Sequence, residues 1–395
     1  MVPARRVFLL LYAASGAAAL VYEVTWTRLL TLQLGHTVAA VSTVLAAFMG
    51  GLAIGAWLAG RRGTSSLRAY ALLEIAIAAA ALLLPLGLAA SRPLLAWAYA
   101  DGAAPTAFAT VRVALSAMLV GVPAAAMGAT FPVAAGWIAA GARDAAGAGA
   151  LYAANTAGAA AGAIAAGFFL IPAIGLRGST WIGVALNVTA AAGAFLLASR
   201  PLPNAEPPKR AKLEGSKTTK SEKKGSKKDS LRASRALRSV PAPGLACAAV
   251  AISGFAALVY EVAWTRLLAL VIGPTTYAFA TMAASFISGL ALGSALGTRL
   301  VKWTARPAVW LSMMLVVAAI AATTGAYFTA TRMPLIVAAE VASPTAAFGD
   351  VVWRQALGTA LLLLPMTVAL GAAFPLALAV AAGATSSAGA DAARV

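Results

Sequence analysis

The stretch SGAAALVYEVTWTRLL, residues 15–30, recurs almost unchanged as SGFAALVYEVAWTRLL at residues 253–268. Both copies place a glutamate, an arginine and two aromatic residues in an otherwise apolar segment. Ionisable side chains are costly in such a segment when it crosses a lipid bilayer. Their recurrence at an offset of 238 residues therefore predicts two structural repeats in one chain.

The composition of the 395-residue chain is typical of a multi-pass membrane protein. Hydrophobic residues make up 61% and charged residues 11%, against about 45–50% and about 25% in soluble domains. Residues 203–240, with 12 Lys or Arg and 4 Asp or Glu, supply +8 of the net charge of +18, and the rest is scattered at the ends of apolar segments. No aromatic residue is interleaved with these lysines to stack on bases, so we predict no nucleic-acid partner.

Apolar runs of about 20 residues, bounded by charged residues, Gly or Pro, predict transmembrane helices that contact the lipid bilayer. The predicted helices are residues 7–27, 38–60, 69–90, 107–130, 149–171, 179–198, 245–265, 276–298, 307–329 and 354–382. The predicted fold is an all-α, polytopic transmembrane bundle of about ten helices.

The distribution of Lys and Arg predicts the orientation of this bundle, because short cytoplasmic loops carry the positive excess. It places the N-terminus, the linker and the C-terminus in the cytoplasm, and we expect the bundle to lie in the inner (plasma) membrane of the cell. The linker, residues 201–242, is basic and too poor in large apolar residues to fold. We expect it to be a solvated tether, with binding to anionic lipid as a second role.

The repeat extends beyond the opening motif. STVLAAFMGGLAIGAWLAGR, residues 42–61, matches ATMAASFISGLALGSALGTR, residues 280–299, and PAAAMGATFP from Pro123 matches PMTVALGAAFP from Pro365. The first repeat, residues 1–200, has six predicted helices, and the second, residues 243–395, has four and is expected to be incomplete. Both start on the same side of the membrane, as the parallel halves of major-facilitator transporters do.

The repeated acids are the first candidates for a functional site. Glu23 and Arg28 are five residues apart, which places them about 140° apart around a helix and makes them poor partners. By symmetry we predict the pairs Glu23–Arg112 and Glu261–Arg354. They are either ion pairs that join the first helix of a repeat to its fourth, or a site for a cationic ligand or a proton relay.

Aromatic and polar residues near these acids extend the candidate binding site. Tyr22, Trp26, Tyr260 and Trp264 are interpreted either as membrane-interface anchors or as an aromatic cage for a small amine. Asn155 lies in a segment rich in Ala and Gly, where it can hydrogen-bond to a neighbouring helix or to a ligand.

Small residues and prolines indicate how the helices pack. GLAIG (51–55), GLALG (289–293) and GAAAG (158–162) are small-xxx-small patterns that allow close helix contact. Prolines are predicted to interrupt the fourth helix of each repeat, and broken helices at equivalent positions indicate a binding site. These prolines are Pro123, Pro132, Pro365 and Pro375.

One cysteine, Cys247, and one histidine, His36, cannot form a multi-ligand metal site, so we expect neither a metal nor a cofactor in this chain.

The motifs SGFAALVYEVAWTRLLAL, GLALGS, MGATFP and LYAANTAGAAAGAIAAGFFLIPAIGLRG resemble the membrane portion of bacterial spermidine synthase-like proteins. These are also known as fused major-facilitator/spermidine synthase proteins. In that family a soluble domain similar to polyamine aminopropyltransferases, which use decarboxylated S-adenosylmethionine, commonly follows the membrane region. The sequence contains no such domain, so the family's catalytic residues have no positions here and we assign none.

The resemblance implies a membrane domain that anchors or feeds an aminopropyltransferase-like domain, with passage of a small amine. The parallel repeats favour an alternative, a free-standing major-facilitator-type transporter of small solutes. A third interpretation is a membrane scaffold that transports nothing. Whether an enzymatic activity is associated with the chain stays open at this level.

Overall fold

The computed structural model describes residues 2–35, 38–103, 105–139, 145–199, 243–273, 275–342 and 347–392, and all regular elements in them are helices. In the first half these are α1 (Val2–Leu34), α2 (Val38–Arg62), α3 (Leu67–Tyr99), a short turn η1 (Ala100–Gly102), α4 (Pro105–Ser116), a π-helical segment η2 (Ala117–Gly121), α5 (Val122–Ala139), α6 (Ala145–Ile164), a π-helical segment η3 (Ala165–Leu170) and α7 (Ile171–Ser199). In the second half they are α9 (Pro243–Val271), α10 (Thr276–Trp303), α11 (Pro307–Thr331), α12 (Met333–Val341) and α13 (Phe348–Ala392). The predicted all-α bundle is confirmed.

Nine helical stretches in the described part of the chain are long and apolar enough to cross a membrane. The longest, Gly149–Ser199, contains two of the predicted helices in sequence. They are separated at Gly175, whose φ of 69° and ψ of −179° are non-helical and suit a residue without a Cβ. The ten predicted helices are therefore all present, and the chain is a multi-pass membrane protein.

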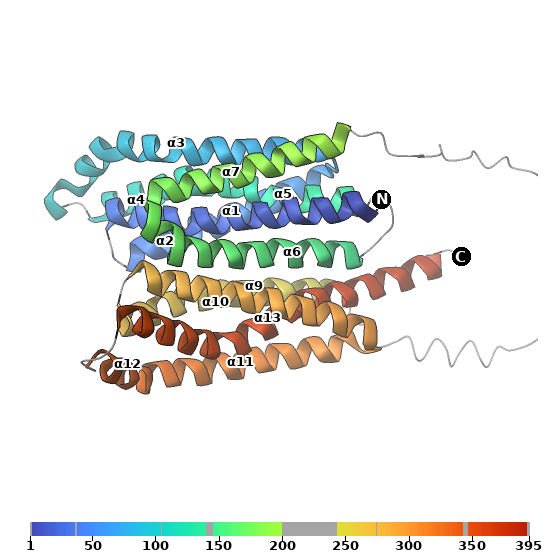
Figure 1. Cartoon of the computed structure of the whole chain (residues 1–395). Helices are drawn as coiled ribbons and strands as arrows, with labels where there is room; N and C mark the ends of the chain where they lie inside the picture. The colour runs from blue at the N-terminus through green and yellow to red at the C-terminus, as the bar shows by residue number, and fades with distance from the viewer. Residues whose placement is uncertain are drawn as a thin grey trace, which may run out of the picture.

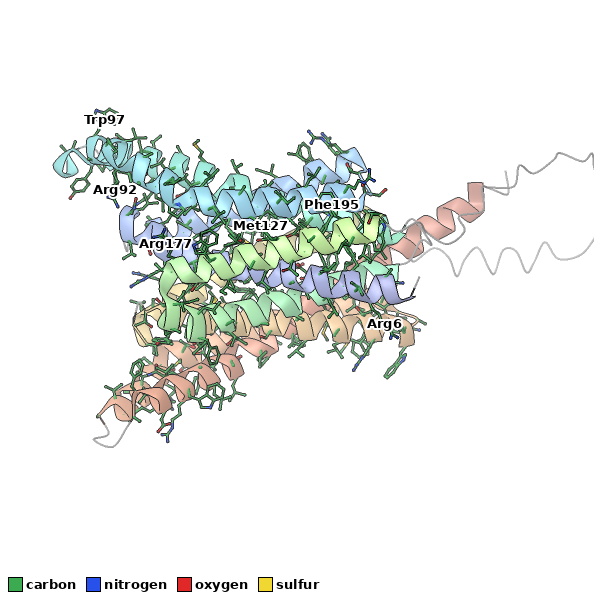
Figure 2. All side chains as sticks on the ribbon, turned by 45° about the horizontal axis from the view of Figure 1, so that its top comes forward. Arg6, Arg92, Trp97, Met127, Arg177 and Phe195 are labelled. Atoms are coloured by element: carbon green, nitrogen blue, oxygen red, sulfur yellow. The ribbon has the colours of Figure 1, made fainter. Side chains whose placement is uncertain are left out.

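The long helices run side by side in one bundle, and the two chain ends lie at the same end of it (Figure 1). We call this the terminal end and the opposite one the far end. Arg6 lies at the terminal end, whereas Arg92 and Arg177 lie at the far end (Figure 2). The common side of the two termini agrees with the expected topology; the cytoplasmic location of that side stays a prediction, and the linker and His36 lie outside the described residues.

Close glycine contacts join the second and fourth helices of the first half. A Cβ added to Gly55 in α2 would overlap the main-chain oxygen of Ala125 in α5. A Cβ added to Gly128 in α5 would overlap the main-chain oxygen of Leu52 in α2. The two backbones touch at this crossing, as a small-xxx-small surface allows.

The same crossing occurs in the second half at equivalent residues. There, a Cβ on Gly293 in α10 would overlap the main-chain oxygen of Val368 in α13, and one on Gly371 would overlap that of Leu290. Each of these four residues is the sequence equivalent of a residue in the first crossing. The repeat seen in the sequence is therefore a repeat of helix packing.

The prediction that prolines interrupt the fourth helix is wrong for the second half and agrees only with a local irregularity in the first. In the first half α4, η2 and α5 follow one another without a loop, and the π-helical segment that interrupts the α-helix ends two residues before Pro123. A wider turn there accommodates a residue that lacks an N–H donor and whose ring crowds the preceding turn. In the second half Pro365 and Pro375 lie inside the uninterrupted helix α13.

The two halves meet mainly through α6, which packs on α1 of its own half and on α10 of the other. Ala159 and Ala163 of α6 share a buried cluster with Trp264 and Met282 of the second half. The first helices of the repeats consequently differ in burial: 56% of the apolar window of α1 is buried, against 17% for α9.

Candidate functional site

The two repeated glutamates contact each other across the boundary between the halves. The carboxyl groups of Glu23 on α1 and Glu261 on α9 lie close enough to interact directly. Only 2% of Glu23 and 7% of Glu261 is exposed, and Oε1 of Glu23 has no hydrogen-bond partner. Two carboxylates in contact repel strongly, so the arrangement requires at least one of the two to carry a proton.

The carboxyl pair lies well inside its two helices. Glu23 is 11 residues before Leu34, the last residue of α1, which corresponds to about 16 Å of helix. Glu261 is 10 residues before Val271, the last residue of α9, or about 15 Å. Both acids are therefore about three helical turns from the C-terminal ends of their helices.

The predicted pairs Glu23–Arg112 and Glu261–Arg354 are wrong. No ion pair joins either glutamate to an arginine in the part of the chain that the structure describes. Arg112 is half-buried, its Nε lacks a partner, and its guanidinium lies 5.8 Å from the ring of Phe108. Arg354 is exposed. In the first repeat the reason is packing, because the fourth helix packs chiefly on the second helix and not on the first. In the second repeat α13 does contact α9, but Arg354 lies on an exposed part of α13.

The four aromatic candidates belong to the protein core. Trp26 and Trp264 are fully buried, which rules out their prediction as interface anchors. Tyr22 is buried and stacks on Trp26, with ring centroids 5.0 Å apart. Tyr260 is half-buried and packs against the cluster that contains Trp264. The rings pack within the core around α1 and α9. No contact among the described residues arranges them as a cage.

Asn155, another predicted site residue, has a packing role in α6. Its main-chain oxygen and its side-chain Oδ1 lie where a Cβ of Gly16 would be. The side chain is half-buried and makes no hydrogen bond to a described residue. Asn155 therefore lies at a close approach of α6 to α1 and has no described contact with the carboxyl pair.

A pocket opens between the two halves on the far-end side of the carboxyl pair. It has a volume of about 130 Å³ and is lined from the first half by α1 and α2 and from the second by α9 and α10. Val24, Thr27 and Arg28 of α1 line it together with their repeat equivalents Val262, Thr265 and Arg266 of α9. The pocket therefore lies on the boundary where equivalent residues of the repeats face one another.

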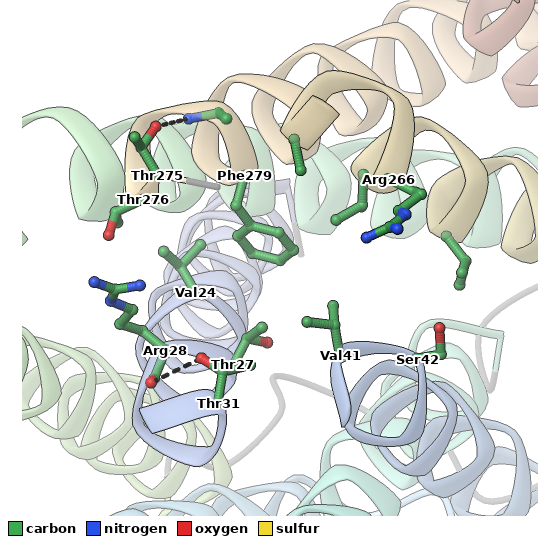
Figure 3. Close-up of a pocket in the computed structure, with 14 residues that line it drawn as sticks. Val24, Thr27, Arg28, Thr31, Val41, Ser42, Arg266, Thr275, Thr276 and Phe279 are labelled. Atoms are coloured by element: carbon green, nitrogen blue, oxygen red, sulfur yellow. Dashed lines mark hydrogen bonds between the residues drawn. The ribbon is translucent and has the colours of Figure 1, made fainter. Parts of the chain in front are cut away.

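Two arginines give this pocket its charge. Arg28 and Arg266 lie on opposite sides of it, with Val24 and Phe279 between them (Figure 3). No acidic residue lines the pocket, and neither arginine forms an ion pair with a described residue. The sequence analysis indicated only that Arg28 does not pair with Glu23. The offset of 238 residues between Arg28 and Arg266 was the signal that could have linked these two arginines.

A second cavity, of about 530 Å³, lies between α6, η3, α10 and α13. Its walls are apolar and aromatic, with no charged residue, and Phe348 and Trp353 on its rim are 70% and 68% exposed. It opens on the outer surface of the bundle, where lipid chains are the surrounding medium. The pocket between the repeats is therefore the candidate site for a polar ligand.

A separate buried polar network is confined to the first half. Glu74 of α3 is fully buried and accepts hydrogen bonds from Oγ of Ser15 at 2.6 Å and from Nδ2 of Asn187 at 2.5 Å. The Asn187 Oδ1 in turn accepts one from the Tyr22 hydroxyl at 2.8 Å. The network ties α3 and α7 to α1 behind the carboxyl pair, and the residue equivalent to Glu74 in the second half is Ser312.

Fold and site together define a class: a multi-pass helical membrane protein with two parallel repeats and a charged pocket between them. A scan against protein-family models finds no match, and a search of curated proteins finds none. Among solved structures, a crystal structure of a variant of the E. coli fucose:proton symporter is similar at 17% identity and a TM-score of 0.35. That match covers 99% of this chain and 91% of the symporter chain.

Proposed function

We propose that the chain is a major-facilitator-type transporter of a small polar solute, which binds between the two repeats. The observation that carries this proposal is the pocket on their boundary, lined by three pairs of equivalent residues. In transporters built from repeats, the substrate site lies at the repeat interface, and access alternates when one repeat rocks against the other.

The carboxyl pair supports the same proposal. Glu23 and Glu261 lie about 7.5 Å deeper along their helices than the arginines, at five residues of 1.5 Å each. Their carboxyl groups interact across the boundary between the halves, and this arrangement depends on a bound proton. Such a contact can open without rearranging either helical core, so it suits an interface that opens and closes during transport.

Cross-linking across the pocket tests whether the halves move. In a Cys247→Ser background, Thr27→Cys and Thr265→Cys place one thiol on each repeat at the pocket wall. After reconstitution into liposomes, a short bifunctional maleimide is expected to abolish most of the uptake of whichever solute is transported, among succinate, phosphate, putrescine and glucose. Each single-cysteine variant, treated in the same way, carries the added maleimide without a link between the halves and is expected to lose less uptake than the double variant.

The proposal fails if the cross-linked double variant transports as fast as the untreated one. It also fails if none of the four solutes enters the liposomes above the rate of empty vesicles.

The family resemblance supports a second candidate function. We infer from the repeated motif that the chain can serve as the membrane anchor of an aminopropyltransferase-like domain and pass a small amine, with Glu23 and Glu261 as the amine site. This second function rests on the motif residues, because the fold and the pocket fit transport of an amine and of other solutes equally.

Variants of Glu23 separate an amine site from a carboxyl pair that only joins the halves. Glu23→Gln should keep the bundle within about 1 kcal/mol of wild type, because its amide can donate to Glu261. Glu23→Ala should cost about 1–3 kcal/mol, because it leaves a buried acceptor unpaired. Both are measured by thermal unfolding in detergent.

Binding of putrescine to the same proteins gives the second readout. Loss of putrescine binding in both Glu23→Gln and Glu261→Gln, with stability retained, would favour the amine site. If Glu23→Gln is as unstable as Glu23→Ala, the carboxyl pair is not what holds the halves together.

A further inference from the structure

We propose that the pocket between the repeats binds a small oxyanion, a carboxylate or a phosphate, clamped between Arg28 and Arg266. That the bound anion is also transported rests on the proposed function. That it binds does not. It assigns the pocket a substrate class opposite in charge to the amine that the repeated glutamates first suggest.

The charges around the pocket favour an anion. Two guanidinium groups face it from opposite halves, and the lining contains no acid. The nearest acids, Glu23 and Glu261, are buried beneath the pocket and interact with each other. They therefore do not neutralise the arginines, and a cation in the pocket would meet two like charges.

The N-terminus of α10 adds a second, independent source of positive potential. Thr275 caps this 28-residue helix by accepting a hydrogen bond from the Ala278 N–H at 3.1 Å, and both residues line the pocket together with Thr276. The first-turn N–H groups of a helix lack intrahelical partners and favour bound anions. Figure 3 shows Thr275 and Thr276 on the same side of the pocket as Arg28.

Hydroxyl groups complete the lining. Thr27, Ser42 and Thr276 line the pocket, and their hydroxyls make no hydrogen bond to a described residue. A hydroxyl can donate to an anionic oxygen, and an arginine can bind a carboxylate or phosphate through two parallel hydrogen bonds. The pocket has room for a small solute.

The groups that would hold the anion are divided between the two halves of the chain. Arg28 belongs to the first half, and Arg266 and Thr276 belong to the second. An anion that contacts both arginines offsets their repulsion and draws the halves together at the far end. A neutral solute of the same size lacks this effect.

The test is direct binding to the full chain purified in detergent, without a requirement for transport. Isothermal titration is carried out with succinate and inorganic phosphate, with glucose and putrescine as neutral and cationic comparisons. Arg28→Gln and Arg266→Gln should each weaken anion binding by about tenfold or more, because each removes a charge-assisted contact. Arg92→Gln, an exposed arginine at the same end of the bundle, should leave binding unchanged.

The outcomes separate the sources of the oxyanion and the ways the inference can fail. Binding of succinate or phosphate in lipid-free detergent identifies a soluble anion, whereas arginine-dependent binding of short-chain phosphatidylglycerol alone identifies a lipid headgroup. Binding of neither, or binding that Arg28→Gln and Arg266→Gln leave intact in folded protein, overturns the inference. Anion binding without uptake leaves the site in place and overturns only the proposed transport.

Discussion

Replacing Gly55 with leucine is expected to prevent the first half from packing. The Cβ alone would overlap the main-chain oxygen of Ala125, and the opposing backbone at Gly128 is equally close to Leu52. Neither helix can yield locally, because both partners at the crossing are main-chain atoms. We expect a loss of at least about 3 kcal/mol of stability, the upper range for overpacking, seen as aggregation or a sharply lowered melting temperature in detergent.

Gly60 in the same helix provides the matched control. A Cβ there has no heavy atom within 4 Å, and the residue is exposed. Gly60→Leu should therefore change stability by no more than about 0.5 kcal/mol, as is usual for surface sites. Equal behaviour of the two variants would show that the close crossing of α2 and α5 does not exist in the folded protein.

The second large effect is expected at Asn187. Its side chain joins Glu74 to the Tyr22 hydroxyl, so Asn187→Leu removes two hydrogen bonds and leaves a fully buried carboxyl group with one donor fewer. Loss of a partner by a buried charged or polar group costs about 3 kcal/mol. Thermal unfolding in detergent, followed by tryptophan fluorescence, measures this loss of stability. Trp26 is a suitable probe because it stacks on Tyr22, which bonds to Asn187.

The repeat provides the comparison for this variant. Ser312 stands where Glu74 stands in the first half and is exposed. Among the described residues its hydroxyl donates a hydrogen bond to Ala308 of its own helix alone, at 3.1 Å. Ser312→Ala should be neutral within about 0.5 kcal/mol. An Asn187→Leu protein as stable as Ser312→Ala would mean that the Glu74 network contributes nothing to the fold.

Most of the fold is predictable from the sequence, because apolar length and repetition are local properties. The ten helices follow from runs of about 20 apolar residues, and the equivalence of Gly55 with Gly293 follows from the offset of 238 residues. The helix ends are less predictable: α1 continues to Leu34, seven residues beyond the predicted end at residue 27. This extension places Glu23 and Trp26 in the interior of their helix and not near its end.

The candidate site was only half predictable. The sequence identified Glu23 and Glu261 as important and equivalent, but it paired each with an arginine of its own repeat. Residues near the axis that relates two repeats tend to meet their own equivalents, and no local pattern shows which face of α1 lies at that axis. The same missing information concealed the pocket between Arg28 and Arg266.

The unequal surroundings of α1 and α9 also bear on how the chain is made. Translation produces α1 to α7 first, so α6 can pack on α1 before α10 leaves the ribosome. The second half can then assemble against helices that are already folded. The dependence runs in one direction, since α9, with 17% of its apolar window buried, offers little support in return. Errors in the first half should therefore spread to the second during biosynthesis, while errors in the second half leave the first intact.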